Sequence, residues 1–384
     1  MSDPIVSHSY VQVHNSLIHL VEYNSDKSWA ANSLKSALYK GNNKSSESNS
    51  SNNSKFDVTR QNLVIFVPGN PGVLGIYHDF LMHLYRVLSS SYGVGSNKRP
   101  TILAISHNNF DHPDHVQYPA VGRVVVDESE LNFVEREWAK SIGYDPNHIE
   151  LQVLNKLIII KRILRERNYS CPFVFVGHSI GCHVILRLLQ DSGISRSHGG
   201  SILIHPALEN LALTNKGSAY VRLFSYKFDL VVQSIAFIVD KLLPKSAKLV
   251  LTEWICPDEF VQSSSKIVLE SIAQLGCPRT LSALVGMAKS ELELVKDIDT
   301  DTLIKPHASK LKLIYALNDY WVNTDNRRVL HEKYSDLYIE EQETEHAFVM
   351  NPRTVMDYVV KVGMFVREFM EENNSVGVES ENVV

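Results

Sequence analysis

Short runs of apolar residues alternate with longer amphipathic stretches along most of the chain from residue 61 onward. The apolar runs predict strands at 63–67, 101–106, 173–176, 201–204, 311–317 and 336–340. The amphipathic stretches predict helices at 76–88, 149–167, 180–190 and 353–371. Continuous apolar strands that alternate with helices are typical of a parallel sheet covered on both faces. The pattern therefore predicts the α/β class, with a mostly parallel central sheet flanked by helices.

The first 60 residues show a different pattern. Residues 10–23 alternate between apolar and polar positions around a central turn, which predicts a β-hairpin. Residues 40–55 are almost entirely Asn, Ser, Lys and Gly. Such a segment cannot bury enough apolar surface to offset the entropy of ordering it. We therefore expect a disordered loop at about 33–58.

A second break in the pattern lies between two predicted strands, from residue 206 to residue 304. This stretch contains helix-like segments at 219–243 and 279–295 but no convincing strand. We interpret it as a helical lid inserted into the core. The chain then divides into five parts. In chain order they are an N-terminal hairpin and loop (1–60), a first core segment (61–205), the insertion (206–304), a second core segment (305–372) and a disordered tail (373–384).

Composition narrows the class of protein. Of the 384 residues, 44 % are hydrophobic and 21 % are charged, and the net charge is −5. These values are ordinary for a globular protein and give no reason to expect nucleic acid as a partner. The longest strongly apolar stretch, 230–239, is too short to cross a bilayer, which takes about 20 residues. The polar start of the chain predicts reduced cytosolic thiols at the four cysteines, Cys171, Cys182, Cys256 and Cys277.

Candidate chemistry begins at FVFVGHSIG, residues 173–181. A buried strand runs directly into a Gly-x-Ser-x-Gly motif that opens a helix, which is the setting of a nucleophile elbow. In such a turn Ser179 is presented at the carboxyl edge of the sheet, and Gly177 and Gly181 allow close packing. The N–H of Ile180 points from the helix start toward developing negative charge.

A serine needs a base to remove its proton, and the base needs an orienting acid. In this architecture the chain order is serine, acid and histidine, on loops after successive strands. The sequence places Asp319 just after one predicted strand and His346 after the next. Asp325, in the same loop as Asp319, is the alternative acid.

Two other histidines compete with His346 for the role of base. His178 precedes the candidate nucleophile, but a residue at that position usually points away from the serine hydroxyl. His205 ends a predicted strand, although it comes before any acid in the chain. A second oxyanion donor is expected in the loop VPGNPG, where the N–H of Asn70 is the candidate. The alternative is that this loop is a plain Pro-Gly turn.

With these residues in view, the chain from about 61 to 371 resembles the lipid-droplet-associated hydrolase family within the α/β-hydrolase superfamily. The loop at 67–72 resembles the family's Pro-Gly-Asn-Pro-Gly loop, and 148–160 resembles the helix before its nucleophile strand. The elbow at 177–181 matches. Residues 205–218 resemble the start of the family's lid, and EHAFV at 345–349 resembles its histidine motif.

The chain departs from the family pattern at the acid. The usual Tyr-Gly-x-x-Asp-x-Trp-x-Pro is here YALNDYWVN. Tyr315, Asp319 and Trp321 remain, but Ala316 replaces the glycine and Asn323 replaces the proline.

The resemblance implies a serine hydrolase of lipid esters, such as triacylglycerol or sterol ester, that needs no metal and no organic cofactor. It also implies a place at the lipid droplet surface, with cytosol or endoplasmic reticulum as a second location, and contact with the lipid monolayer through the insertion. The alternative is that the helices of the insertion only pack on the core. Three alternatives stay open: a non-catalytic or weakly active adaptor at the droplet or membrane surface, an acyltransferase with the same triad, and a small-ester esterase free in the cytosol.

Overall fold

The computed structural model describes residues 3–14, 16–24, 62–92, 99–111, 123–126, 131–166, 172–226, 228–322 and 325–381. Within these ranges, the side chains of 123, 166, 228, 229, 325, 326 and 374–381 are not part of the description. The predicted disordered loop at 33–58 and Cys171 lie outside the described residues.

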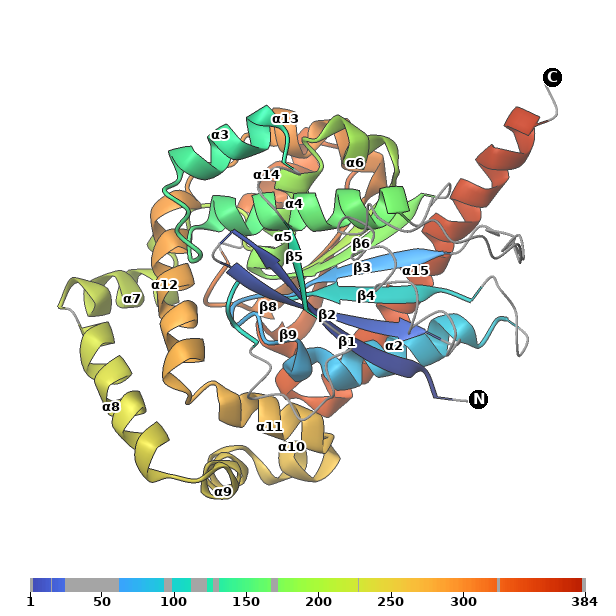
Figure 1. Ribbon diagram of the computed structural model, residues 1–384. Helices are drawn as coiled ribbons and strands as arrows, with labels where there is room; N and C mark the ends of the chain where they lie inside the picture. Colours follow the sequence, from blue (N-terminus) through green and yellow to red (C-terminus); the bar gives the residue numbers. More distant parts are fainter. Residues whose placement is uncertain are drawn as a thin grey trace, which may run out of the picture.

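A nine-stranded sheet forms the centre of the molecule (Figure 1). Its order is β5-β1-β2-β4-β3-β6-β7-β8-β9. Pairing is antiparallel only for β1 with β2 and for β2 with β4, so the predicted mostly parallel α/β sheet is confirmed. The strands are β1 Ile5–Val13, β2 Ser16–Asn24, β3 Leu63–Val67, β4 Thr101–Ile105, β5 Arg123–Val126, β6 Phe173–His178, β7 His198–Ile204, β8 Leu311–Asn318 and β9 Tyr338–Glu345.

The N-terminal hairpin is part of this sheet. Strand β2 pairs with β4 through residues 20–23, and β1 pairs with the short strand β5. The sequence pattern predicted the hairpin but neither its partner nor β5, because pairing between distant segments leaves no local signal.

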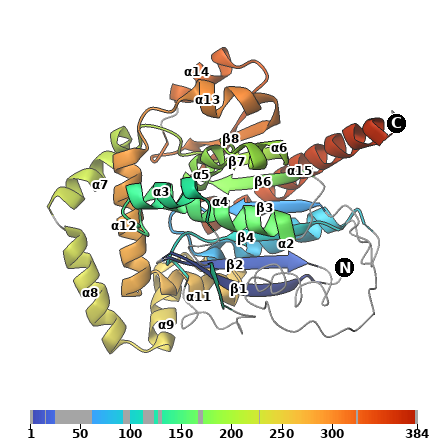
Figure 2. The ribbon, with the colours of Figure 1, turned by 45° about the horizontal axis from the view of Figure 1, so that its top comes forward.

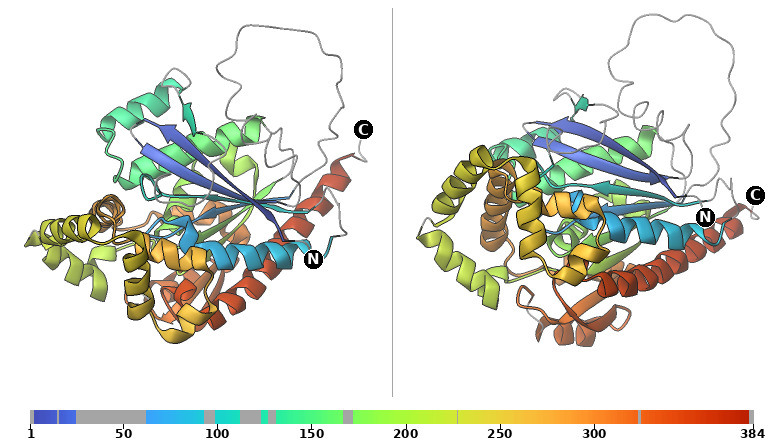
Figure 3. Two further views of the ribbon diagram at one scale, coloured as in Figure 1. Left: turned by 60° about the horizontal axis from the view of Figure 1, so that its bottom comes forward. Right: turned by 90° about the horizontal axis from the view of Figure 1, so that it is seen from below.

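Helices cover both faces of the sheet (Figure 3). On one face, α2 (His78–Ser89) packs against α15 (Pro352–Glu381). On the other, α4 (Ile149–Glu166) packs against α5 (Ile180–Leu188). The remaining peripheral helices are α3 Phe133–Ser141, α6 Ser192–Arg196 and α14 Asp325–Lys333.

The end of the chain differs from the prediction. We expected a disordered tail at 373–384, but α15 continues to Glu381. No proline interrupts this stretch, so the helical hydrogen bonds of its packed part continue into the polar end.

The insertion lies between β7 and β8, and its described part contains helices joined by short connections and no strand. The segment predicted as one helix at 219–243 is divided into α7 (Asn215–Ser225) and α8 (Phe228–Leu242). In Figures 1 and 2, α7, α8 and α9 (Lys245–Ile255) form an arm at the left, and α12 (Pro278–Leu294) lies between this arm and the sheet. The other elements are η3 Leu211–Leu213, α10 Asp258–Ser263, α11 Lys266–Gln274, α13 Thr300–Leu303 and η4 Lys305–Lys310. We call helices α7 to α12 the lid.

The lid leaves and re-enters the core at one point, which we call the neck. The N–H of Asn210 donates to the carbonyl oxygen of Lys296 at 2.9 Å, and the N–H of Leu211 donates to that of Val295 at 3.3 Å.

None of the helices in the described ranges is both long and apolar enough to cross a bilayer.

The parallel strands deliver the candidate residues to the same edge of the sheet. Strand β3 ends at the loop that contains Asn70, and β6 ends directly before Ser179. Strands β7, β8 and β9 end directly before His205, Asp319 and His346. Strand β9 is longer than predicted, because the polar stretch before His346 continues the edge strand.

Candidate functional site

Ser179 lies in the sharp turn between β6 and α5, with a φ of 53° and a ψ of −124°. A positive φ is uncommon for a residue with a side chain and costs on the order of 1–3 kcal/mol. The N–H of Ser179 donates to the carbonyl oxygen of Ile204 at 2.9 Å, which helps to hold the turn. Gly181 is needed because a Cβ there would lie 2.4 Å from the carbonyl oxygens of Val67 and Pro68.

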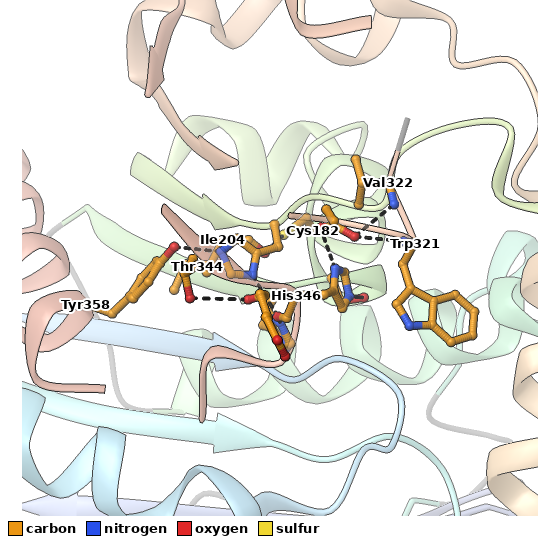
Figure 4. Close-up of polar contacts among 12 residues, drawn as sticks. Cys182, Ile204, Trp321, Val322, Thr344, His346 and Tyr358 are labelled. Carbon is orange, nitrogen blue, oxygen red and sulfur yellow. Dashed lines mark hydrogen bonds and ion pairs between the residues drawn. The ribbon is translucent and has the colours of Figure 1, made fainter. Parts of the chain in front are cut away.

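A continuous chain of hydrogen bonds connects the three predicted residues (Figure 4). The Nε2 atom of His346 lies 2.8 Å from Oγ of Ser179, and its Nδ1 atom lies 2.7 Å from Oδ2 of Asp319. The His346 side chain is 15 % exposed, whereas that of Asp319 is 1 % exposed. The imidazole is therefore open to an incoming molecule while the carboxylate behind it is shielded from water.

The loop after β8 holds the Asp319 carboxylate in place. Its Oδ1 atom accepts the N–H groups of Trp321 at 2.8 Å and Val322 at 3.1 Å. Burial raises the pKa of Asp319, but the hydrogen bond and charge of His346 and the Trp321 N–H lower it more, so the pKa lies below its ordinary value. Asp319 is thus ionised at neutral pH. The replacement of the family glycine by Ala316 leaves this arrangement complete.

The competing residues take other positions. His178 and His205 lie beside His346, and each of them hydrogen-bonds to the backbone carbonyl oxygen of His346. Burial, and after it the charge of His346, lowers the pKa of His178 well below its usual range and that of His205 to about 4. Neither can take up a proton near neutral pH. Asp325 begins α14, and its side chain is outside the described set.

The loop after β3 lies against the nucleophile. A Cβ at Gly69 would lie 3.0 Å from Cβ of Ser179, which measures how closely the two backbones approach. The Gly69 N–H donates to the hydroxyl of Tyr77 at 3.0 Å. The Asn70 side chain points to the lid, where its Nδ2 atom donates to Oε1 of Glu291 at 3.0 Å and to the carbonyl oxygen of Leu284 at 3.2 Å.

A buried lysine, Lys156, is connected to this loop through the side chain of His107. Nζ of Lys156 lies 3.0 Å from Nδ1 of His107, whose Nε2 atom lies 2.9 Å from the carbonyl oxygen of Pro68. Burial lowers the pKa of Lys156 to about 7. In the sequence, Lys156 lies in the stretch 148–160, which only its resemblance to a helix of the family distinguishes. His107, Tyr77 and Glu291 were not identified, because no motif marks them.

One group of side chains has the spacing of a metal site. Nitrogen or oxygen atoms of His205, Asp319 and His346 lie within 4.8 Å of one another. However, both ring nitrogens of His205 and both of His346 have hydrogen-bond partners in the protein. These contacts account for the cluster without a metal ion.

Comparison with solved structures identifies the fold as that of the α/β-hydrolases. The 2-hydroxy-6-oxo-6-phenylhexa-2,4-dienoate hydrolase of Rhodococcus sp. superimposes with a TM-score of 0.51 and 12 % identity, over 94 % of this chain and 99 % of the other. At this identity the likeness concerns the fold alone.

Sequence comparison gives the family. Residues 60–349 match the family described as lipid-droplet associated hydrolase, and the chain belongs to that family. The lipid droplet-associated hydrolase of Drosophila melanogaster is 22 % identical over 311 residues, which cover 79 % of this chain and 89 % of the relative. The lipid droplet-associated hydrolase of Homo sapiens is 23 % identical over 298 residues, which cover 76 % of this chain and 81 % of the relative. Fold and family together make the protein a hydrolase.

Proposed function

We propose that the protein is a serine hydrolase that cleaves carboxylic esters of lipids, triacylglycerol or sterol esters, at the surface of lipid droplets. The observation that carries the catalytic part is the unbroken hydrogen-bonded chain from Asp319 through His346 to Ser179. The lipid part rests on the family and on the names of the relatives that match this chain. Endoplasmic reticulum and cytosol are secondary locations in this proposal.

The mechanism is a two-step acyl transfer. Oγ of Ser179 attacks the ester carbonyl carbon while Nε2 of His346 takes the hydroxyl proton, and Asp319 stabilises the resulting imidazolium. The proton then passes to the leaving alkoxide as the ester C–O bond breaks. Water, deprotonated in turn by His346, attacks the acyl-enzyme and releases the fatty acid. The N–H groups of Ile180 and Asn70 stabilise the oxyanion, each by about 3 kcal/mol in barrier height.

We place the lipid contact on the arm of the lid. Large apolar side chains on α8 and α9 are exposed, among them Leu242 at 73 %, Trp254 at 82 % and Ile255 at 68 %. Exposed apolar surface of this extent marks an interaction site in a globular protein. Burying such side chains in a lipid monolayer contributes about 25 cal/mol for each Å² removed from water.

A fluorophosphonate probe tests the catalytic proposal directly, since it reacts only with an activated serine. The wild type is expected to be labelled and Ser179→Ala not. Ser192→Ala, at an exposed serine that begins α6, is the matched control and is expected to label like the wild type. Absence of labelling in the wild type would favour a non-catalytic adaptor. Product analysis with an alcohol or lysolipid present would separate hydrolysis from acyl transfer.

A further inference from the structure

Two imidazoles converge on the backbone carbonyl of the candidate base. Nε2 of His178 lies 2.9 Å from the carbonyl oxygen of His346, and Nδ1 of His205 lies 2.7 Å from the same oxygen. A carbonyl oxygen only accepts hydrogen bonds and has two lone pairs. Each ring must therefore present an N–H to it, and both lone pairs are used.

The outer nitrogen of each ring has a tyrosine partner. The hydroxyl of Tyr77 lies 2.7 Å from Nδ1 of His178. The hydroxyl of Tyr358 lies 2.6 Å from Nε2 of His205 (Figure 4). Tyr77 accepts the Gly69 N–H, so its own proton is free to be donated to His178. The contacts are satisfied by neutral rings with the proton on Nε2 in His178 and on Nδ1 in His205.

The backbone at His205 is strained in a way that serves this contact. Its φ is 46°, in the left-handed region that residues with side chains rarely occupy. Strain of this kind persists when the surrounding structure over-determines it, and it clusters at functional sites. Here it lies at the carboxyl end of β7, where the chain turns and the imidazole meets the His346 carbonyl.

The base itself is in a place that needs external support. His346 follows β9, which in the described part of the chain is an edge strand paired with β8 alone and whose side chains are exposed or half-buried. Its Nδ1 contact with Asp319 holds the ring, but not the backbone from which the ring extends. A rotation of that backbone would move Nε2 away from Ser179.

We propose that His178 and His205 are positioning residues that hold the backbone carbonyl of His346 and thereby aim its imidazole at Ser179. This inference rests on the proposed function. The contact through Tyr77 also connects the base to the loop that contains Gly69, so base, nucleophile turn and oxyanion loop form one hydrogen-bonded unit.

Matched amide substitutions test the inference. The amide nitrogen of asparagine occupies about the place of histidine Nδ1, and that of glutamine about the place of Nε2. His205→Asn and His178→Gln therefore keep the N–H that faces the carbonyl, whereas His205→Leu and His178→Leu lose it. All four variants lose the contact with the tyrosine, so each pair differs mainly in the donor to His346.

The readout is kcat on a water-soluble ester, normalised to active sites titrated with the fluorophosphonate probe. The leucine variants are expected to lose about 10- to 100-fold in kcat with KM little changed, because a small displacement of a catalytic group costs this much. The amide variants are expected to recover most of the loss. A merely structural role would lower the melting temperature of both members of a pair and leave kcat per active site equal, which would overturn the inference.

Nitrogen NMR of the histidine side chains gives a reading that does not depend on activity. At pH 7 it is expected to show neutral rings with the proton on Nε2 of His178 and on Nδ1 of His205, the second being the rarer form of free histidine. The opposite tautomer at either position would contradict the proposed contact. A wild type that fails to react with the probe would sink the proposed function, while the NMR result would still decide the geometry.

Discussion

In the proposed mechanism, Asp319 acts through the tautomer that it imposes on His346. Its Oδ2 atom accepts the Nδ1 proton, which leaves the lone pair of Nε2 facing Ser179. Its Oδ1 atom is occupied by two backbone N–H groups, so the carboxylate cannot rotate without breaking them. One side chain thus fixes both the position and the protonation pattern of the proposed base.

Asp319→Asn is expected to lower kcat on a soluble ester by about 10⁴-fold while the melting temperature changes little. The amide oxygen can still accept the N–H groups of Trp321 and Val322, but the amide nitrogen favours the wrong tautomer of His346. Steady-state kinetics and thermal unfolding would measure the two effects. Asp336→Asn, at an exposed position, is the control, and an active Asp319→Asn protein would remove the acid from the mechanism.

The sequence could predict Ser179, Asp319 and His346 because each follows a strand, and parallel strands end at the same edge. It favoured His346 as the base, but it could not show how this residue and its two competitors, His178 and His205, are arranged. In the structure the His346 ring centroid lies 5.3 Å from that of His178 and 5.8 Å from that of His205. Only the hydrogen bonds distinguish the three, and these depend on partners far away in the chain.

Among the elements, α12 makes the direct contact between the lid and the loop after β3. Glu291 on α12 accepts a hydrogen bond from the Asn70 side chain. Burial raises the pKa of Glu291 to about 8, an effect that the Asn70 contact only partly offsets. The carboxyl is therefore protonated in the folded protein at pH 7, whereas in the unfolded chain it is ionised.

This difference in protonation predicts that the free energy of unfolding depends on pH. Between about pH 4.5 and 8 the folded protein holds a proton at Glu291 that the unfolded chain has released, so its contribution to the free energy of unfolding falls as the pH rises. Glu291→Gln keeps an oxygen for Asn70 but does not titrate. The melting temperature of this variant is expected to fall less, or rise more, between pH 5 and 8 than that of the wild type.

Taking the difference between the two proteins cancels two other contributions in this pH range. The buried histidines titrate there in the unfolded chain, and Lys156, with a pKa of about 7, titrates there in the folded protein. Glu293→Gln, an exposed position two residues further along α12, is expected to keep the wild-type dependence. Identical slopes for Glu291→Gln and the wild type would show that Glu291 ionises normally in the folded state.

The sequence predicted the elements of the core better than those outside it. Core strands such as β3 and β6 are continuous apolar runs, so the local sequence is enough to identify them as strands. Strand β5 has four residues and is a strand only because β1 lies beside it. The division between α7 and α8 likewise has no clear signal, since residues 219–243 are apolar around much of the helix circumference.

At the scale of the whole molecule, the proposed function makes the arm of the lid the part that meets a lipid surface. Leu242 and Trp254 are among its most exposed apolar side chains. Each large apolar residue that enters lipid contributes about 1.5–3 kcal/mol, and 1.4 kcal/mol is a tenfold change in affinity.

The double variant Leu242→Glu/Trp254→Glu is expected to bind a triolein emulsion at least about 100-fold more weakly and to hydrolyse it correspondingly slowly. Hydrolysis of a soluble ester is expected to stay at the wild-type level, because the substitutions lie on α8 and α9, which α12 separates from the sheet (Figure 1). Flotation with the emulsion measures the binding. The matched control is Phe133→Glu/Val134→Glu on α3, where two apolar side chains are 70 % and 69 % exposed. Equal losses in both double variants would argue against the arm as the lipid contact.

The neck makes the lid a segment of the chain that could be exchanged as a unit. Because residues 210–211 and 295–296 are hydrogen-bonded to each other, the two ends of the lid lie side by side at the neck. A short turn that joins these two ends would reconnect the chain without changing the register of β7 and β8. Chimeras that exchange lids between members of the family can therefore test which properties of the protein depend on the lid and which depend on the core.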